Sequence, residues 1–536
     1  MILDDLARET LNIAYVHSKI RVYSPFGKKL KEGLKTVNTQ NIKGLSLAYD
    51  RLDKLVKAID KKGHIFSELR EMFKKVMTLD QSFLRIEKDQ VLTATEFFEI
   101  KTFLFLLIEM EALINKADVD LPKRYQVHRI EVLEKLLDPN DYQVKSFYVY
   151  DNYSKKLSNI RKNLKEETAQ KDKAYKKIIE DLQKDYSLKI KRSGEIIVDK
   201  NNKKLIEKFE GDNRVYYQNE NIMSVIFSIK SSELLKDHIE KIDHLKVIEE
   251  KEVDKIRKDL TLRIKDELDL LKDNYESIGH LDLLMGKAYF SLAFNGVKPE
   301  IREEPSLAIE DGRHIIVEEN LRKKEKEYIP ISIETSSGVT LITGANMGGK
   351  TVSLKMIGLL FYIAQLGLFV PAKSFSFHPI DFIRTSIGDA QDIHKGLSSF
   401  GAEIEVIKVA TVMNGFGLLL VDELARGTNP VEGYALSKGI IDFFKKKEMM
   451  TIISTHFDGL ADDDLKHYQV KGLKTINEAI DVETIDEHMD YRLIPVQSNK
   501  TVPKDALNIA KLLGLKDEIL SSAEKYLLKG SDGSGK

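Results

Sequence analysis

The chain has 536 residues, which is more than one hydrophobic core accommodates and predicts about two to four domains. A hydrophobic content of 42% with 32% charged residues is typical of a globular protein with long, solvated helices. Because the net charge is −1, any binding to nucleic acid must come from a local patch. The absence of cysteine excludes disulfides, thiolate metal sites and a cysteine nucleophile.

The N-terminal sequence MILDDLARET carries acidic residues where a signal peptide needs a basic flank and an apolar run. A strongly apolar stretch, residues 356–372, is interrupted by Gln365, two glycines and Pro371. Such a segment fits a buried helix that leads into a strand better than it fits a membrane span. We therefore expect a cytoplasmic protein that has no membrane partner.

Residues 1–150 are expected to form a helical core or lever domain. Apolar residues there recur mainly at helical spacing, as at Leu45, Leu47, Leu52, Leu55 and Ile59.

Residues 151–278 are predicted to form two long antiparallel coiled-coil arms with a small tip. Apolar positions in the first arm fall at Leu157, Ile160 and Leu164 amid dense Lys and Glu, and a second arm returns later. Between about 187 and 230 the apolar period shortens to that of strands, which indicates a β-containing tip. Residues 151–200 hold 14 Lys and Arg against 9 Asp and Glu. This charge is either a solvated coiled-coil face or a surface that contacts phosphates.

Residues 279–308 are expected to return through the lever. From 309 to 527 the apolar runs HIIVEE, GVTLITG, FGLLLVDE and MMTIISTH are interpreted as strands that alternate with helices. This alternation predicts a doubly wound α/β domain. Residues 528–536, which are rich in Gly and Ser, are expected to be a disordered tail.

Residues 344–351, GANMGGKT, match the pattern G-x-x-x-x-G-K-[ST] between an apolar strand and a helix, the context that this motif requires. The glycines let backbone N–H groups close around phosphates, and the helix N-terminus adds partial positive charge. The lysine places an ammonium group on the phosphates, and the threonine offers a hydroxyl to Mg²⁺. The predicted nucleotide-binding residues of this loop are Gly344, Asn346, Gly348, Gly349, Lys350 and Thr351.

Two acids end the apolar run FGLLLVDE downstream of the phosphate loop. Asp422 would hold Mg²⁺ through water together with Thr351, and Glu423 would polarise the attacking water. The next strand ends in Thr455-His456, where a histidine would face the γ-phosphate. The alternatives are helix-capping acids and a structural histidine. These residues predict a nucleotide hydrolase in which Glu423, His456 and Lys350 take part in catalysis.

The segments TGANMGGKT, DELARGTNPVEG and STH resemble the ATPase domain of the MutS family, whose loops read close to TGPNMGGKS, DE-x-GRGT and ATH. Further segments are similar in the same order: GRHIIVEE, YIP, SIGDAQDIHKGLSSFGAEI and DALNIAKLLGL. The helical body and paired arms are similar to the family's lever and clamp. The resemblance implies an α/β P-loop ATPase domain of the ABC/MutS type, joined to an all-α lever bundle with a long antiparallel coiled-coil clamp. It also implies ATP and Mg²⁺ as cofactors.

The resemblance implies two further roles. Tyr328 would pack on the adenine base, and Ser398 would reach the γ-phosphate bound by a partner subunit. The chain would then form a homodimer through its ATPase domains, with two composite sites. The alternative is that Ser398 and Ser399 cap a helix.

The chain also departs from the family pattern. Ala345 replaces a proline of the phosphate loop, and we expect a compact form without the family's mismatch-reading domain and without a nuclease domain after Leu527. The family reads mismatches with a Phe-x-Glu triplet. Here the triplet Phe97-Phe98-Glu99 follows Thr95 within a helical pattern, so we interpret it as part of a core face.

Three functions remain open at this point. The first is an ATPase whose arms enclose duplex or branched DNA. The second is a protein-remodelling ATPase, because compact proteins of this kind resemble the ATPase subunit of a reactivase for adenosylcobalamin-dependent lysine 5,6-aminomutase. The third is an ATP-dependent dimerisation module without a dedicated substrate.

Overall fold

The chain forms two compact units, one within residues 1–76, 110–127 and 275–536 and the other within residues 77–109 and 128–274. The structure is a computed structural model, and the residues it describes are 2–144, 146–344, 349–388, 399–425, 428–457, 459–462, 464–473, 489–496, 507, 510 and 515–531.

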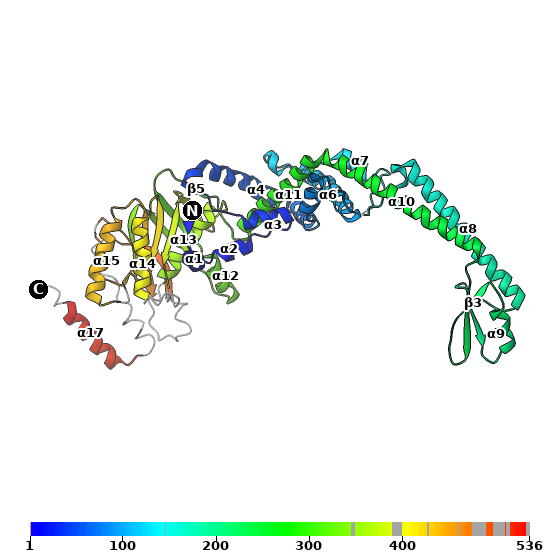
Figure 1. Cartoon of the computed structure of the whole chain (residues 1–536). Coiled ribbons are helices and arrows are strands. Elements are labelled where there is room, and N and C mark those ends of the chain that lie inside the picture. The colour runs from blue at the N-terminus through cyan, green and yellow to red at the C-terminus, as the bar shows by residue number, and fades with distance from the viewer. Residues whose placement is uncertain are drawn as a thin grey trace. The chain divides into compact units, whose positions relative to one another are not determined.

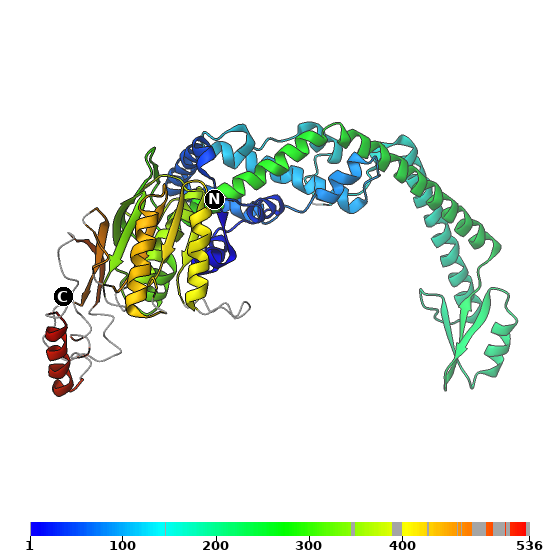
Figure 2. The same cartoon turned by 60° about the vertical axis from the view of Figure 1, so that its left-hand side comes forward.

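The first unit is built around a seven-stranded sheet (Figures 1 and 2). In spatial order its strands are β1 (Ile2–Leu3), β10 (Phe382–Ser386), β11 (Gly417–Val421), β12 (Met450–Ser454), β8 (Gly338–Thr343), β13 (Lys466–Leu473) and β14 (Met489–Pro495). All neighbours are parallel except β13 and β14, which are antiparallel. The prediction of an α/β fold with parallel strands is confirmed.

Both faces of this sheet are buried, which explains why its strands are almost uninterrupted apolar runs. In β11, Leu418 and Leu420 belong to the core on one face, and Leu419 and Val421 belong to the core on the other face. Helices α1 (Asp5–Thr10), α2 (Ile13–Lys19) and α13 (Lys350–Gln365) cover the first face, whereas α14 (Ser399–Val412) and α15 (Pro430–Phe444) cover the second.

The apolar stretch at 356–372 lies in this core, as the sequence indicated. Every residue of α13 from Ser353 to Gln365 except Lys355 is buried. Among the described residues, no helix is both long enough and apolar enough to span a bilayer.

The N-terminal residues are part of the same sheet and core. Ile2 pairs with Phe382 in the edge strand β1. The ring of His17 in α2 is hydrogen-bonded to the Tyr362 hydroxyl of α13 at 2.6 Å. The sequence placed these residues in a helical core or lever domain of residues 1–150. In the structure the apolar face of α1 and α2 belongs to the same core as α13.

A smaller four-stranded sheet lies in the first unit, and its spatial order is β5 (Glu300–Ile301), β9 (Ser374–Phe377), β6 (Ser306–Gly312) and β7 (Ile331–Ser336). The segment HIIVEE was predicted to be a strand, and that prediction is wrong, because helix α12 (Ile315–Lys323) begins there. Arg313 pairs with Glu318 at 2.8 Å across the start of the helix. Only Ile315 of α12 is buried. The β-branched residues of this run therefore do not lie in a strand that is buried on both faces.

Among the described residues, the first unit also contains helices α3 (Pro25–Glu32), α4 (Ile42–Phe73) and α17 (Asp517–Ser531). Helices α6 (Ala94–Ala117) and α11 (Leu268–Ala293) contribute residues to both units.

In the second unit two long helices, α8 (Lys155–Tyr186) and α10 (Glu233–Lys265), lie side by side (Figure 1). Their contacts run in opposite directions along the chain, because Ser154 contacts Glu252 and Glu167 contacts His238. The two helices are therefore antiparallel. Two shorter helices of this unit are α5 (Asp80–Glu87) and α7 (Glu131–Leu137).

The segment between the two long helices folds into a small α/β tip. It contains the antiparallel strands β2 (Glu195–Asp199), β4 (Ser224–Ile229) and β3 (Val215–Glu220), in that spatial order, and helix α9 (Lys203–Glu210). Phe209 of α9 and Phe227 of β4 form its buried core together with Leu182 of α8.

A buried ion pair holds together the part of the second unit that surrounds α6. The ammonium of Lys101 lies 3.1 Å from a carboxylate oxygen of Asp138 and also donates to the Tyr150 hydroxyl at 3.1 Å. Both ionic side chains are almost completely buried, at 2% and 4% exposed. Nearby, Phe97 is fully buried and stacks on Phe147, as expected for a core face.

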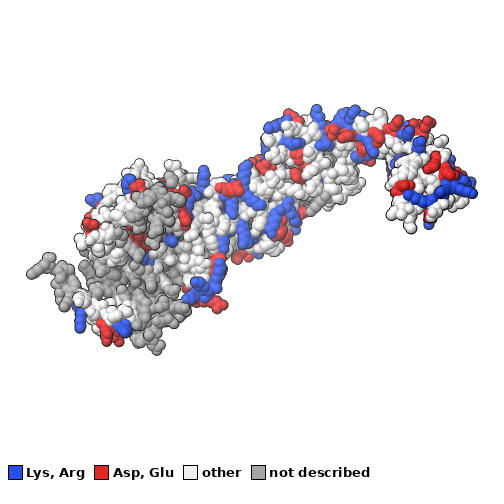
Figure 3. Space-filling view, turned by 60° about the horizontal axis from the view of Figure 1, so that its bottom comes forward, with Lys and Arg blue, Asp and Glu red and all other residues white. Residues whose placement is uncertain are grey.

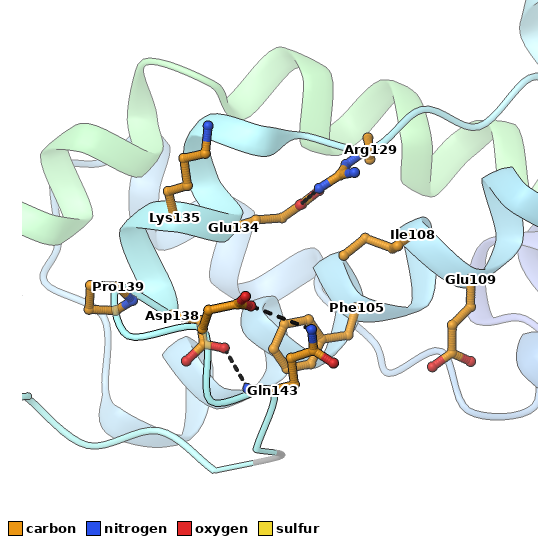
Figure 4. A pocket seen from close by; sticks show the side chains of 10 residues that line it. Phe105, Ile108, Glu109, Arg129, Glu134, Lys135, Asp138, Pro139 and Gln143 are labelled. Atoms are coloured by element: carbon orange, nitrogen blue, oxygen red, sulfur yellow. Dashed lines mark hydrogen bonds and ion pairs between the residues drawn. The ribbon is translucent and has the colours of Figure 1, made fainter.

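A pocket of about 590 Å³ opens beside this ion pair, between α6 and α7 (Figure 4). Its charged groups are mostly satisfied by protein atoms. Arg129 pairs with Glu134 at 2.5 Å, and Asp138 accepts the backbone N–H of Gln143 at 2.8 Å. We therefore interpret this pocket as a packing feature of the helical body.

We predict that Lys101→Met destabilises the second unit by about 3–5 kcal/mol, because it leaves the Asp138 carboxylate buried without its ammonium. Hydrogen exchange of the α6 amides would measure the loss. Lys135→Met is the matched control, because Lys135 lies on the rim of the same pocket with 82% of its side chain exposed. Its loss should cost less than about 1 kcal/mol. Equal protection of α6 in both variants would contradict the prediction.

Candidate active site

The carboxyl ends of three adjacent strands meet at one edge of the seven-stranded sheet. The order there is β11, β12, β8, and the residues that follow these strands are Asp422, Thr455 and Gly344. In open α/β sheets, ligands bind at this carboxyl edge. The fold therefore places the start of the phosphate loop, the two acids after β11 and Thr455-His456 after β12 at the same edge of the sheet.

The described ends of the phosphate loop have a backbone that favours glycine. Gly344 has a φ of +124° and Gly349 a φ of +80°. A Cβ atom on Gly349 would lie 2.8 Å from Cδ1 of Tyr491, so a larger residue would clash with that ring. Ala345, Asn346, Met347 and Gly348 lie outside the described residues.

Lys350 is the first residue of α13 and is only 2% exposed. Its ammonium donates to the carbonyl of Gly344 at 2.5 Å, across the base of the loop. The side chain thus returns toward the loop instead of extending into solvent, and it adds its charge to the positive end of the α13 dipole.

The hydroxyl of Thr351 donates to Oδ2 of Asp422 at 2.6 Å. The two predicted metal ligands, which are far apart in the sequence, therefore lie in contact. A hydroxyl and a carboxylate provide the hard oxygen atoms that Mg²⁺ prefers. On this observation, the residues present fit a Mg²⁺–nucleotide site.

Glu423 occupies a tight turn after β11. Both Glu423, with φ +52°, and Ala425, with φ +58°, are in the left-handed region, which is unfavourable for non-glycine residues and is often found at functional sites. The backbone N–H of Glu423 donates to Oγ of Ser454 at 2.9 Å. The N–H of Ala425 donates to the Glu403 carboxylate at 2.9 Å, and burial raises the pKa of Glu403.

His456 is exposed just beyond β12, and its ring packs against Phe457 with 4.5 Å between the ring centroids. The preceding residue, Thr455, donates its N–H to the carbonyl of Ile342 in β8 at 3.0 Å. The segment that carries His456 is therefore fixed to the strand that leads into the phosphate loop.

Of the two residues implied by the family resemblance, Tyr328 is described and Ser398 is not. Tyr328 precedes β7, and its hydroxyl accepts the backbone N–H of His314 at 3.1 Å. Burial raises the pKa of Tyr328 to about 12 and lowers that of His314 to about 4. The predicted stacking of Tyr328 on adenine stays a prediction. Ser398 lies outside the described residues.

Two side chains of this site were missed by sequence reasoning, Ser454 and Glu403. Ser454 ends the apolar strand β12, directly before Thr455-His456, so its position beside that motif was the available signal. Glu403 lies in α14, within the segment that resembles the family's signature, and no spacing rule relates it to the turn at 423–425.

Comparison with known proteins agrees with this geometry. Residues 340–529 match the family model for MutS domain V. The chain is 29% identical over 511 residues to "Endonuclease MutS2" of Caldanaerobacter subterraneus subsp. tengcongensis, covering 91% of this chain and 60% of that protein.

Two further relatives called "Endonuclease MutS2" are similar over shorter regions. That of Acetivibrio thermocellus is 33% identical over 53% of this chain and 35% of the relative. That of Pediococcus pentosaceus is 34% identical over 52% of this chain and 34% of the relative. The chain thus spans less than two thirds of the length of these curated relatives. Residues 340–529 thus match MutS domain V, and most of the chain is similar to MutS2 proteins.

Proposed function

We propose that the chain is an ATPase of the MutS type whose paired helices α8 and α10 act on DNA. The observation that carries the ATPase assignment is the contact between Thr351, at the start of the phosphate-loop helix, and Asp422, beside Glu423. This contact brings a phosphate-binding helix N-terminus and two strand-end acids into one site, which is the arrangement that nucleotide hydrolysis needs.

In the proposed mechanism each residue has a separate task. Lys350 neutralises phosphate charge. Thr351 and Asp422 would hold Mg²⁺, which would supply further neutralisation of phosphate charge when bound. Glu423 orients the attacking water and accepts its proton. His456, at the end of the neighbouring strand, faces the γ-phosphate. Tyr328 packs on the adenine base.

The proposed active form is a homodimer through the ATPase domains. Ser398 from one subunit completes the site of the other, so that bound ATP joins the two domains. Within one chain, Glu403, five residues after Ser398, accepts the N–H of Ala425 and so links helix α14 to the turn that carries Glu423.

The proposed contact with DNA rests on a stripe of lysines along α8. Lys155, Lys162, Lys173 and Lys184 follow one another at intervals of 7, 11 and 11 residues, close to whole numbers of helical turns. All four are exposed, and none has an ion pair among the described residues. They lie on one side of the helix over about 44 Å.

The lysine stripe is a local feature of a surface that is otherwise mixed. On the face seen in Figure 3, Lys and Arg are interspersed with Asp and Glu. Within α8 itself, Glu166 and Glu180 lie near the stripe, so its charge is reduced but remains positive. We therefore propose weak, salt-sensitive and sequence-independent contacts with DNA phosphates.

Glu423→Gln is expected to retain ATP binding and to lower hydrolysis by about 10²–10⁴-fold, because it removes the water-orienting carboxylate and leaves the phosphate loop intact. Binding of a fluorescent ATP analogue and steady-state phosphate release would measure the two effects. Lys350→Ala is the comparison, since it should weaken binding itself. A Glu423→Gln variant that hydrolyses ATP at the wild-type rate would exclude the proposed role.

Composite sites are tested by mixing subunits. Ser398→Ala and Lys350→Ala should each be inactive alone, and an equal mixture should recover about a quarter of the wild-type rate if subunits exchange freely. Half of the dimers are then heterodimers, and one of the two sites in each heterodimer combines an intact Lys350 with an intact Ser398. Mixing Ser398→Ala with a chain that carries both substitutions is the control and should recover nothing. Full activity of Ser398→Ala alone contradicts the shared site.

Contacts of the lysine stripe with about four phosphates predict a slope of about −4 for log Kobs against log salt. Triple charge reversal at Lys155, Lys162 and Lys173 should reduce this slope to about −1. The same reversal at Lys236, Lys251 and Lys258, which are exposed on α10 and lie outside the lysine stripe, is the comparison and should reduce the slope less. Fluorescence anisotropy of labelled duplex at several salt concentrations is sufficient. No retention of DNA at low salt would instead favour a protein substrate for the paired helices.

A further inference from the structure

Ser454 binds three successive residues of the turn that carries the two acids. Its hydroxyl donates to Oδ1 of Asp422 at 2.5 Å and accepts the N–H of Glu423 at 2.9 Å. Its carbonyl accepts the N–H of Leu424 at 3.3 Å. Ser454 is fully buried, so these hydrogen bonds do not compete with bulk water.

Strand register explains why Ser454 reaches this turn. In the parallel pair of β11 and β12, Val421 lies opposite Ile453, so Asp422 and Ser454 are the next residues on both strands. Strand β12 stands between β11 and β8 in the sheet. A side chain at the end of β12 therefore lies directly between the acid turn and the strand that leads into the phosphate loop.

The hydroxyl of Ser454 fixes both acids, by different means. Each carboxylate oxygen of Asp422 accepts a different hydrogen bond, Oδ2 from the Thr351 hydroxyl and Oδ1 from the Ser454 hydroxyl. The two bonds together set the rotation of the carboxylate. For Glu423 the hydroxyl acts on the backbone, which it holds in the left-handed conformation with φ +52°. That backbone conformation sets the direction in which the Glu423 side chain leaves the turn.

We propose that Ser454 is a positioning residue for ATP hydrolysis: it orients the Asp422 carboxylate toward Thr351 and directs Glu423 toward the water. This inference rests on the proposed function. The family pattern noted in the sequence has alanine in this place, in ATH where this chain has STH, so alanine is compatible with the strand and the hydroxyl is a departure. Ser454→Ala also leaves the carbonyl bond to Leu424 in place.

The test compares four variants of the full chain by phosphate release, ATP-analogue binding, Mg²⁺ titration and thermal unfolding. Ser454→Ala should lower kcat by about 10–100-fold and raise the Mg²⁺ concentration for half-maximal activity, with ATP affinity within about threefold of wild type. Ser454→Thr restores a hydroxyl and should recover most of kcat. Glu423→Gln reports whether the proposed site is the one that hydrolyses ATP.

Ser437→Ala is the matched control. Ser437 in α15 is also fully buried, and its hydroxyl has no hydrogen-bond partner among the described residues. This variant makes the same chemical change away from the turn and should keep kcat and the Mg²⁺ dependence of the wild type.

The outcomes distinguish a failure of the positioning role of Ser454 from a failure of the proposed ATPase site. Wild-type kcat and Mg²⁺ dependence in Ser454→Ala, with an inactive Glu423→Gln, overturn the positioning role and leave the proposed ATPase site standing. A Glu423→Gln variant as active as wild type overturns the proposed site itself. If Ser454→Ala unfolds, the Thr variant decides: low kcat with normal stability and normal ATP binding in Ser454→Thr contradicts a role for the hydroxyl alone.

Discussion

The parallel register of β11, β12 and β8 is the constraint on which the whole site depends. In the register the three strands end within two residues of one another, so the residues that follow them converge although they come from distant parts of the chain. The burial of both faces of the sheet fixes this register, because a shift by one residue would turn every apolar side chain of β11 toward the opposite face. The contact between Thr351 and Asp422 follows from that packing.

Sequence patterns predicted the parts of the site that have a local signature. The phosphate loop and the acid pair could be recognised because each follows an apolar strand at a fixed distance, and the parallel sheet then brings them together. Ser454 and Glu403 could not be recognised in this way. A single serine at the end of an apolar strand is common, and a glutamate in a helix is more so. Only the three-dimensional pairing shows that they bind the same turn.

The fold was predicted less completely in two places, for identifiable reasons. The run HIIVEE is rich in β-branched residues, and its strand interpretation ignored that burial at this position is one-sided. Residues 2–19 have ordinary amphipathic helices whose apolar face fits a bundle as well as it fits a sheet.

The place of the N-terminal residues has a consequence for biosynthesis. Strand β1 and helices α1 and α2 contact residues about 360 positions later, so they leave the ribosome long before their partners exist. At about 5–20 residues per second, the interval is about 20–70 s. During that time the apolar face of α2 has no sheet to cover it. The second unit, which is encoded between them, can fold first, and the core of the first unit closes only after residues 350–386 have been synthesised.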